Sequence, residues 1–243
     1  MNWKLAFLVA LIAIPGPVAI SWQALPLLID IESLTVPLQT LQIATALQSI
    51  VLVVLASGIG ALLSAKVGLR APVLSSLASG GDVRAAIGPQ LLPGVIGGFL
   101  GAAVIIGFYE FAPSELAVLQ ERGSIPFAAR ILYGGVTEEV LIRWGLMTIL
   151  VWAGWRTLQR ARAVPSDAIV WLGIGISALV FGVSHVPSVV AGMGGVSGMV
   201  VAYITFGNAI FGIVAGYLFW RYGLEAAITA HVLAHVIAYA IRG

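Results

Sequence analysis

Two adjacent glutamates and an arginine interrupt an otherwise apolar stretch of the chain, YGGVTEEVLIRWG, at residues 133–145. Glu139 and Arg143 stand at positions i and i+4, so on a helix they share a face and can neutralise each other. Glu138 would point about 100° away from Glu139, without an obvious partner on the same helix. A carboxylate whose neighbour is already paired is a candidate general base, and we expect Glu138 to have this role.

All three histidines of the chain occur in or beside apolar segments. His185 ends the sequence FGVSH, while His231 and His235 stand at positions i and i+4, a spacing that places both imidazoles on one side of a helix. A carboxylate on one helix that faces histidines from two other helices can hold a water molecule and remove its proton, with or without a metal ion. These residue types therefore predict a hydrolytic site.

The predicted site combines both groups of residues. We expect the catalytic residues to be Glu138, Glu139, His185, His231 and His235. Arg143 is interpreted as the structural partner of Glu139. The alternative to a catalytic role for Glu139 is a structural one, in which the ion pair with Arg143 fixes the direction of Glu138. A carboxylate with two or three histidines also suits zinc, so a divalent metal ion held by Glu138, His185, His231 and His235 is a possible cofactor. The same groups can also work as acid, base and oxyanion donor without a metal.

The composition predicts an integral membrane protein. Of the 243 residues, 60% are hydrophobic and 9% are charged, whereas soluble domains carry about 25% charged residues. A charge at the centre of a bilayer costs roughly 2.5–3.5 kcal/mol on the insertion scale. The charged residues of the predicted site must therefore have a function that offsets this cost. The net charge of +2 does not indicate nucleic acid binding, and the absence of cysteine excludes thiolate metal sites and thiol nucleophiles.

Seven segments reach the length of about 20 apolar residues that a spanning helix needs. They are Leu5–Ile29, Leu41–Leu63, Leu91–Phe108, Pro126–Trp155, Ala168–Val190, Met199–Trp220 and Leu224–Ile241. A long segment has room for an eighth span, so we predict an all-α transmembrane bundle of seven or eight spans. No linker separates two domains, and residues 1–243 are expected to form a single membrane domain.

Basic residues recur on every second connection between these segments. Lys4 precedes the first span, Lys66 to Arg84 follow the second, Arg156 to Arg162 follow the fourth and Arg221 follows the sixth. Because cytoplasmic loops are enriched in Lys and Arg, we expect the N-terminus to lie in the cytoplasm and the protein to reside in the cytoplasmic (inner) membrane. The broken, polar stretch at residues 66–90 is expected to lie along the cytoplasmic interface.

Three motifs in order carry a family resemblance: E-E-x-x-x-R at Glu138, Glu139 and Arg143, F-x-x-x-H ending at His185, and H-x-x-x-H at His231 and His235. The chain, in a motif-bearing core of about residues 126–243, resembles the CAAX protease and bacteriocin-processing (abortive-infection) intramembrane proteases, which include the type II CAAX prenyl endopeptidases.

The resemblance implies a helical bundle whose cavity opens to the cytoplasm and an endopeptidase that cleaves a peptide bond in a membrane-associated or lipidated protein or peptide. Glu138 and His185 would activate water, while His231 and His235 would stabilise the oxyanion. Prenyl endopeptidases usually have Asn where this chain has His235. A histidine can donate, ligate or titrate there, which makes a metal site more plausible.

Other interpretations remain open from the residues alone. The sequence GVSG at residues 195–198 matches the G-x-S-G of rhomboid serine proteases, with Ser197 and one of His231 or His235 as a dyad. Intramembrane Glu, Arg and His also build the proton relays of transporters, so a proton-coupled carrier is an alternative. A third is a non-catalytic immunity protein that keeps the protease fold.

Overall fold

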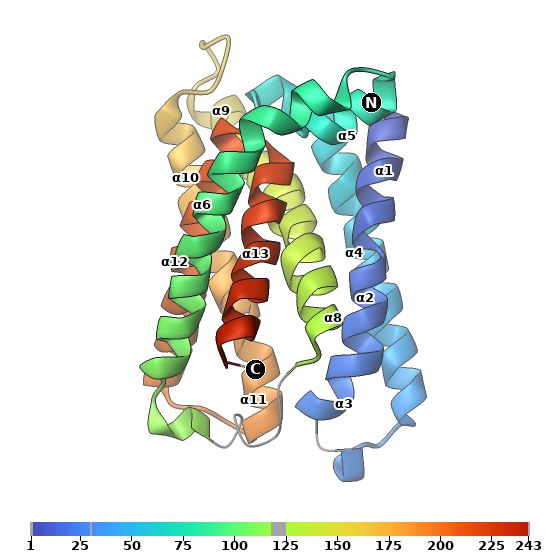
Figure 1. Cartoon of the computed structure of the whole chain (residues 1–243), viewed down its shortest axis with the longest axis vertical. Helices are drawn as coiled ribbons and strands as arrows, with labels where there is room; N and C mark the ends of the chain where they lie inside the picture. Colours follow the sequence, from blue (N-terminus) through green and yellow to red (C-terminus); the bar gives the residue numbers. More distant parts are fainter. Residues whose placement is uncertain (1, 30, 118–124, 243) are drawn as a thin grey trace.

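The computed structural model describes residues 2–29, 31–117 and 125–242, and within these ranges its regular secondary structure is helical. In Figure 1 most helices run along the long axis of the molecule, and the two chain ends lie toward opposite ends of it. The first half contains α1 (Trp3–Ala13), α2 (Pro15–Ala19), α3 (Leu25–Leu28), α4 (Leu38–Leu63), α5 (Pro72–Ser79) and α6 (Val83–Glu110). The second half contains α8 (Phe127–Ala129), α9 (Thr148–Leu158), α10 (Asp167–Ser184), α11 (Val186–Met193), α12 (Gly198–Arg221) and α13 (Leu224–Arg242).

Shorter helical turns join or interrupt these elements. Helix α8 continues without a break through two π-helical segments, Arg130–Thr137 and Val140–Met147, into α9. We call this continuous stretch, residues 127–158, the site helix. A further π-helical segment, Ile20–Ala24, joins α2 to α3. Three 3₁₀ turns lie at Ile31–Ser33, Ser64–Val67 and Ser114–Leu116.

Six helices of the described chain are long and apolar enough to cross a membrane. They are Trp3–Leu28, Leu38–Val67, Val83–Glu110, Asp167–Met193, Gly198–Arg221 and Leu224–Arg242, and each contains or overlaps one of the predicted spans. The remaining predicted span, Pro126–Trp155, falls on the site helix, whose middle turns carry three charged side chains. The prediction of an all-α, multi-pass membrane protein is confirmed, and six of the predicted spans have the length and composition of membrane helices.

Close contacts between small residues hold the later helices together. A Cβ atom on Gly182 of α10 would lie 2.0 Å from the backbone oxygen of Thr205 in α12, and one on Gly212 of α12 would lie 2.9 Å from the Cβ of Ala178. Within lipid the hydrophobic effect does not drive helices together, so membrane helices associate through close approach of their backbones at small residues. Helices α10 and α12 are thereby fixed to each other next to His185.

The N-terminal helices support the site helix from its other side. The hydroxyl of Thr137 donates a hydrogen bond to the carbonyl of Ala13 at 2.6 Å, and the indole N–H of Trp144 donates to the carbonyl of Ser57 at 3.2 Å. Both side chains are fully buried. The two contacts flank Glu138 and Glu139 along the site helix and fix its rotation relative to α1 and α4.

The predicted interfacial stretch forms α5 and the start of α6. Figure 1 shows both at the end of the bundle that holds the N-terminus. The carboxylate of Glu225, at the start of α13, accepts a hydrogen bond from the Leu74 N–H at 2.8 Å. The Leu224 N–H donates to the carbonyl of Arg70 at 3.0 Å. These bonds dock α5 on the helix that carries His231 and His235.

Candidate functional site

The site helix is π-helical on both sides of Glu138 and Glu139. One π-helical segment ends at Thr137 and the next begins at Val140. Such segments are rare and occur frequently at functional sites, because each inserts a residue into the helical repeat and redirects the side chains around it. The two glutamates consequently face different partners on different helices.

Glu139 forms the buried ion pair that its spacing from Arg143 predicted. Its Oε1 lies 3.1 Å from Arg143 Nη1, and both side chains are fully buried. The guanidinium of Arg143 also donates through Nη2 to the carbonyl of Gly212 at 3.1 Å, and its Cζ lies 4.7 Å from the centre of the Phe181 ring. A buried pair of this kind balances its own charge, which is how an apolar helix can contain it.

The same oxygen of Glu139 is also bound to His231 of α13. The distance from His231 Nδ1 to Glu139 Oε1 is 2.7 Å, and the His231 side chain is 5% exposed. Because a carboxylate paired with an arginine accepts hydrogen bonds, Nδ1 carries the proton and donates it. The second ring nitrogen of His231, Nε2, is then directed away from Glu139. Spacing along the chain gave no indication of this contact, which joins residues 92 positions apart.

Glu138 faces His185, at the junction of α10 and α11. Glu138 Oε1 lies 3.8 Å from His185 Nε2, and the two side chains are 17% and 30% exposed. His185 Nδ1 lies 2.8 Å from the carbonyl of Phe181. A carbonyl oxygen can only accept, so Nδ1 carries the proton and Nε2 presents a lone pair toward Glu138. Two acceptors separated by this distance suit a water molecule that donates to both.

His235 lies beside His231 on the same face of α13. The two rings are stacked with their centres 5.0 Å apart. In the described part of the chain the Nδ1 of His235 is buried without a hydrogen-bond partner. Its Nε2 packs so closely on Gly134 of the site helix that a Cβ there would lie 2.7 Å away. Gly134 belongs to the YGG sequence before the glutamates, but nothing in that sequence identified its partner.

The structure thus brings Glu139, Arg143, His231 and His235 into one connected cluster, and Glu138 and His185 into a pair. Phe181 joins them, because its carbonyl accepts from His185 while its ring centre lies 6.0 Å from that of His231. The guanidinium of Arg143 also stacks on the Phe181 ring, with its Cζ 4.7 Å from the ring centre. The pair and the cluster are therefore parts of one site.

The donor set does not form a metal cage. Within residues 2–29, 31–117 and 125–242, no three His, Asp or Glu side chains are arranged so that they could hold a metal ion. The possible zinc set of Glu138, His185, His231 and His235 is therefore not assembled among the described residues.

Ser197 occupies a helix cap and contacts neither histidine of the alternative dyad. Its hydroxyl donates to Glu115 Oε2 at 2.7 Å and accepts from the Val200 N–H at 3.3 Å, while its own N–H donates to Glu115 Oε1 at 2.9 Å. The hydrogen bonds from the Ser197 hydroxyl and N–H hold the pKa of Glu115 below its usual range. These contacts explain the serine of GVSG as the N-cap of α12.

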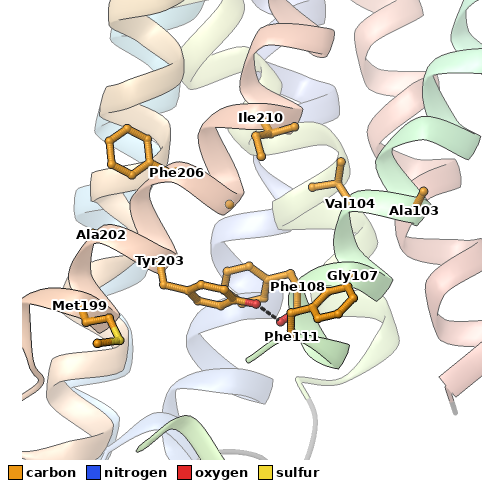
Figure 2. Close-up of a pocket in the computed structure, with 11 residues that line it drawn as sticks. Ala103, Val104, Gly107, Phe108, Phe111, Met199, Ala202, Tyr203, Phe206 and Ile210 are labelled. Atoms are coloured by element: carbon orange, nitrogen blue, oxygen red, sulfur yellow. Dashed lines mark hydrogen bonds between the residues drawn. The ribbon is translucent and has the colours of Figure 1, made fainter. Parts of the chain in front are cut away.

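A large apolar cavity lies elsewhere, on the outer face of α6 and α12. Its volume is about 580 Å³, and Figure 2 shows Phe108, Tyr203, Phe206 and Ile210 among its lining. Neither the glutamates nor the histidines line it. Active sites usually combine apolar walls with a few polar groups that orient the substrate. This cavity offers almost none, so it is not the candidate site.

Comparison with protein-family models matches residues 122–237 to the family described as Type II CAAX prenyl endopeptidase Rce1-like. The matched range contains all of the candidate site residues. No curated protein and no solved structure matches the chain.

Proposed function

We propose that the protein is an intramembrane endopeptidase that hydrolyses a peptide bond with a water molecule activated by Glu138 and His185, because residues 122–237 match the model of the Rce1-like type II CAAX prenyl endopeptidase family. The family implies a membrane endopeptidase with a protein or peptide substrate. The observation that carries the residue assignment is the separation of 3.8 Å between Glu138 Oε1 and His185 Nε2.

The pair has the chemistry that water activation requires. A water between the two groups donates one hydrogen to the carboxylate and the other to the imidazole lone pair, which leaves its own lone pairs free for attack. As its oxygen bonds to the scissile carbonyl carbon, the water gives a proton to Glu138. That proton then passes to the nitrogen of the leaving peptide as the C–N bond breaks, and Glu138 is regenerated.

The Glu139 cluster stabilises the charge that this attack creates. When Nε2 of His231 is protonated, the ring can donate to the developing oxyanion while the Glu139 carboxylate balances its positive charge from the other side. We propose His235 as a second donor, because it is stacked on His231 and its buried Nδ1 has no other hydrogen-bond partner in the described chain. In this proposal Glu139 and Arg143 are positioning residues, and His231 and His235 contact the substrate.

The surroundings of the site favour a substrate that is itself associated with the membrane. Six helices of the described chain have the length and composition of membrane spans, and two of these carry the site histidines: Asp167–Met193 contains His185, and Leu224–Arg242 contains His231 and His235. We therefore propose a membrane-associated or lipidated protein or peptide as the substrate, in keeping with the name of the matched family. We also keep the proposal that the N-terminus faces the cytoplasm.

Substitution of Glu138 by glutamine tests the proposal. The amide has nearly the same shape but cannot take a proton from water, so the purified, reconstituted Glu138→Gln protein should lose at least about a hundredfold in cleavage rate of a natural substrate. Its chromatographic profile and thermal unfolding should match those of the unchanged protein.

Ser197→Ala provides the matched control for the alternative nucleophile. Because Ser197 caps α12 and bonds to Glu115, this variant should keep full cleavage activity. Full activity in Glu138→Gln would remove the general-base assignment, and loss of activity in a folded Ser197→Ala protein would restore the serine alternative.

A further inference from the structure

Asn208 is a polar residue in the middle of α12 that the proposed mechanism does not use. Its Nδ2 donates to the carbonyl of Ile204, one turn earlier in the same helix, at 2.8 Å. Within the described ranges its Oδ1 and its second N–H have no hydrogen-bond partner. Polar side chains within membrane helices are costly and mark functional positions. No bond from this amide to another helix of the described chain explains its presence.

The side chain of Asn208 lies on the inner face of α12. The residues at helical spacing from it on that face are 5% exposed or less: Ile204, Phe211, Ala215 and Phe219. The residues on the opposite face of the helix are 39–62% exposed: Phe206, Ile210, Ile213 and Tyr217. Asn208 belongs to the inner face, yet it is only half-buried. Its accessible surface therefore borders a space inside the bundle and not the surrounding lipid.

Contacts before and after Asn208 place it at the level of the site. Three residues before it, Thr205 lies against Gly182 of α10. Four residues after it, the carbonyl of Gly212 accepts a hydrogen bond from Arg143 at 3.1 Å. Asn208 thus lies between the contact that fixes α10 and the ion-paired arginine of the site.

The two histidines of the proposed mechanism flank this part of α12. Phe211, three residues after Asn208, has its ring centre 4.6 Å from that of His231. On α10, the carbonyl of Phe181 holds the imidazole of His185. A substrate whose scissile carbonyl reaches both imidazoles would therefore pass its main chain beside the Asn208 amide.

The main chain of a substrate in this site needs hydrogen-bond partners of its own. Away from water, each unpaired N–H or C=O group costs free energy. An extended peptide can pair with the edge of a sheet, but the described residues form helices and contain no strand. The backbone groups within a helix are already bonded to each other. A side-chain amide offers both a donor and an acceptor without carrying a charge.

We propose that Asn208 binds the main chain of the substrate, pairing with the N–H and the C=O of one residue next to the scissile bond. In an extended chain these two groups of one residue point the same way, so one partner can bond to both. The free N–H of Asn208 donates to the substrate carbonyl, and Oδ1 accepts from the substrate N–H. This inference rests on the proposed function, because it takes the space beside the histidines as the substrate site.

The first test measures binding, so that it does not depend on turnover. The probe is a fluorescent peptide that ends in a CAAX sequence, prepared with and without a prenyl group, in keeping with the matched family. In a series of copies, an ester replaces one peptide bond at a time on either side of the scissile bond, which removes one N–H donor. Affinities are measured with the reconstituted Glu138→Gln and Glu138→Gln/Asn208→Leu proteins.

One ester of the series should bind to the Glu138→Gln protein about tenfold more weakly than the unmodified peptide, because it leaves Oδ1 without its donor. The added Asn208→Leu change should weaken binding of the unmodified peptide by a similar factor. It should also abolish the difference between that ester and the unmodified peptide, because the two changes remove the same contact.

Two further variants keep the test independent of misfolding. Asn208→Ala removes the amide without adding bulk to the interior and should behave as Asn208→Leu does. Gln48→Leu removes an exposed amide from α4 and should keep the full affinity and the discrimination. In cleavage assays, Asn208→Ala should raise KM about tenfold and leave kcat within about threefold, because the contact is the same before and during the attack of water.

Each outcome supports or overturns the role of Asn208. Discrimination against one ester that disappears in both Asn208 variants supports it. Equal binding of all esters by the Glu138→Gln protein, or discrimination that survives both variants, overturns it while any cleavage activity stands. If the discrimination is present but the unchanged protein cleaves no peptide, the main-chain site stands and the proposed endopeptidase activity falls. Absence of binding to every peptide of the series overturns both.

Discussion

Glu139 is the residue on which the arrangement of the site depends. Its Oε1 lies 3.1 Å from Arg143 and 2.7 Å from His231, so one buried oxygen serves two partners on two helices. The other oxygen, Oε2, is buried without a hydrogen-bond partner in the described chain. The carboxylate cannot be replaced by a neutral group without leaving the arginine unbalanced.

Glu139→Gln should therefore destabilise the protein strongly. Removal of one partner from a buried ion pair leaves an uncompensated charge and typically costs about 3–5 kcal/mol. Denaturant titration of the purified protein in detergent would measure the loss. Glu138→Gln, which leaves the ion pair intact, is the matched control and should change stability much less.

A double variant separates stability from chemistry. Glu139→Gln/Arg143→Met removes both charges, so it should recover much of the stability lost in the single variant, yet remain inactive because His231 has lost its carboxylate. A Glu139→Gln protein as stable as the unchanged one would contradict the assignment of Glu139 as the anchor of the cluster.

At the scale of elements, the contact between α10 and α12 sets the position of His185. Gly182 lies against the backbone of Thr205 and is three residues before His185. The carbonyl of Phe181, the residue before this glycine, holds the imidazole at 2.8 Å. Any outward movement of α10 would therefore shift the Phe181 carbonyl and the histidine away from Glu138.

Gly182→Ala should lower both stability and activity. The added Cβ would lie 2.0 Å from the Thr205 oxygen, and relief of such a clash in a packed interior costs about 1–3 kcal/mol. Thermal unfolding and cleavage rate report the two effects. Gly175→Ala on the same helix meets nothing within 4 Å and should be neutral or slightly stabilising. Equal behaviour of the two variants would contradict the proposed positioning by α10.

How much of the structure could be predicted from the sequence depends on how far apart along the chain the interacting residues lie. Span positions are set by local hydropathy, and six of the seven predicted spans coincide with candidate membrane helices of the described chain. The Glu139–Arg143 pair is set by spacing within one helix, and it was predicted and confirmed. The contacts of Glu139 with His231 and of Gly134 with His235 join segments about a hundred residues apart. They depend on how two helices pack, which no local pattern encodes, and the same is true of the π-helical segments around Glu138.

At the scale of the whole molecule, the two ends of the chain lie toward opposite ends of the bundle in Figure 1. We propose that the site helix adds a seventh crossing to the six candidate spans of the described residues, which would place the two ends on opposite sides of the membrane. The basic residues of the predicted cytoplasmic loops, Lys66 to Arg84 and Arg156 to Arg162, occur at the end of the bundle that holds the N-terminus. This distribution favours a cytoplasmic N-terminus.

Labelling of single cysteines tests this orientation, and the natural sequence has no cysteine to interfere. Gly81 precedes α6 and Phe111 follows it, and both are exposed. A membrane-impermeant maleimide should label Gly81→Cys only in inverted vesicles and Phe111→Cys only in intact spheroplasts. Labelling of both from one side would show that α6 does not cross the membrane.

The central claim is that Glu138 and His185 share one water molecule at the point where a substrate carbonyl would bind. An experimental density map of the protein in lipid tests it most directly. We predict an ordered water within hydrogen-bond distance of both Glu138 Oε1 and His185 Nε2, with His231 Nδ1 bound to Glu139. A Glu138 carboxylate directed toward lipid, or separated from His185 with no water between them, would contradict the account.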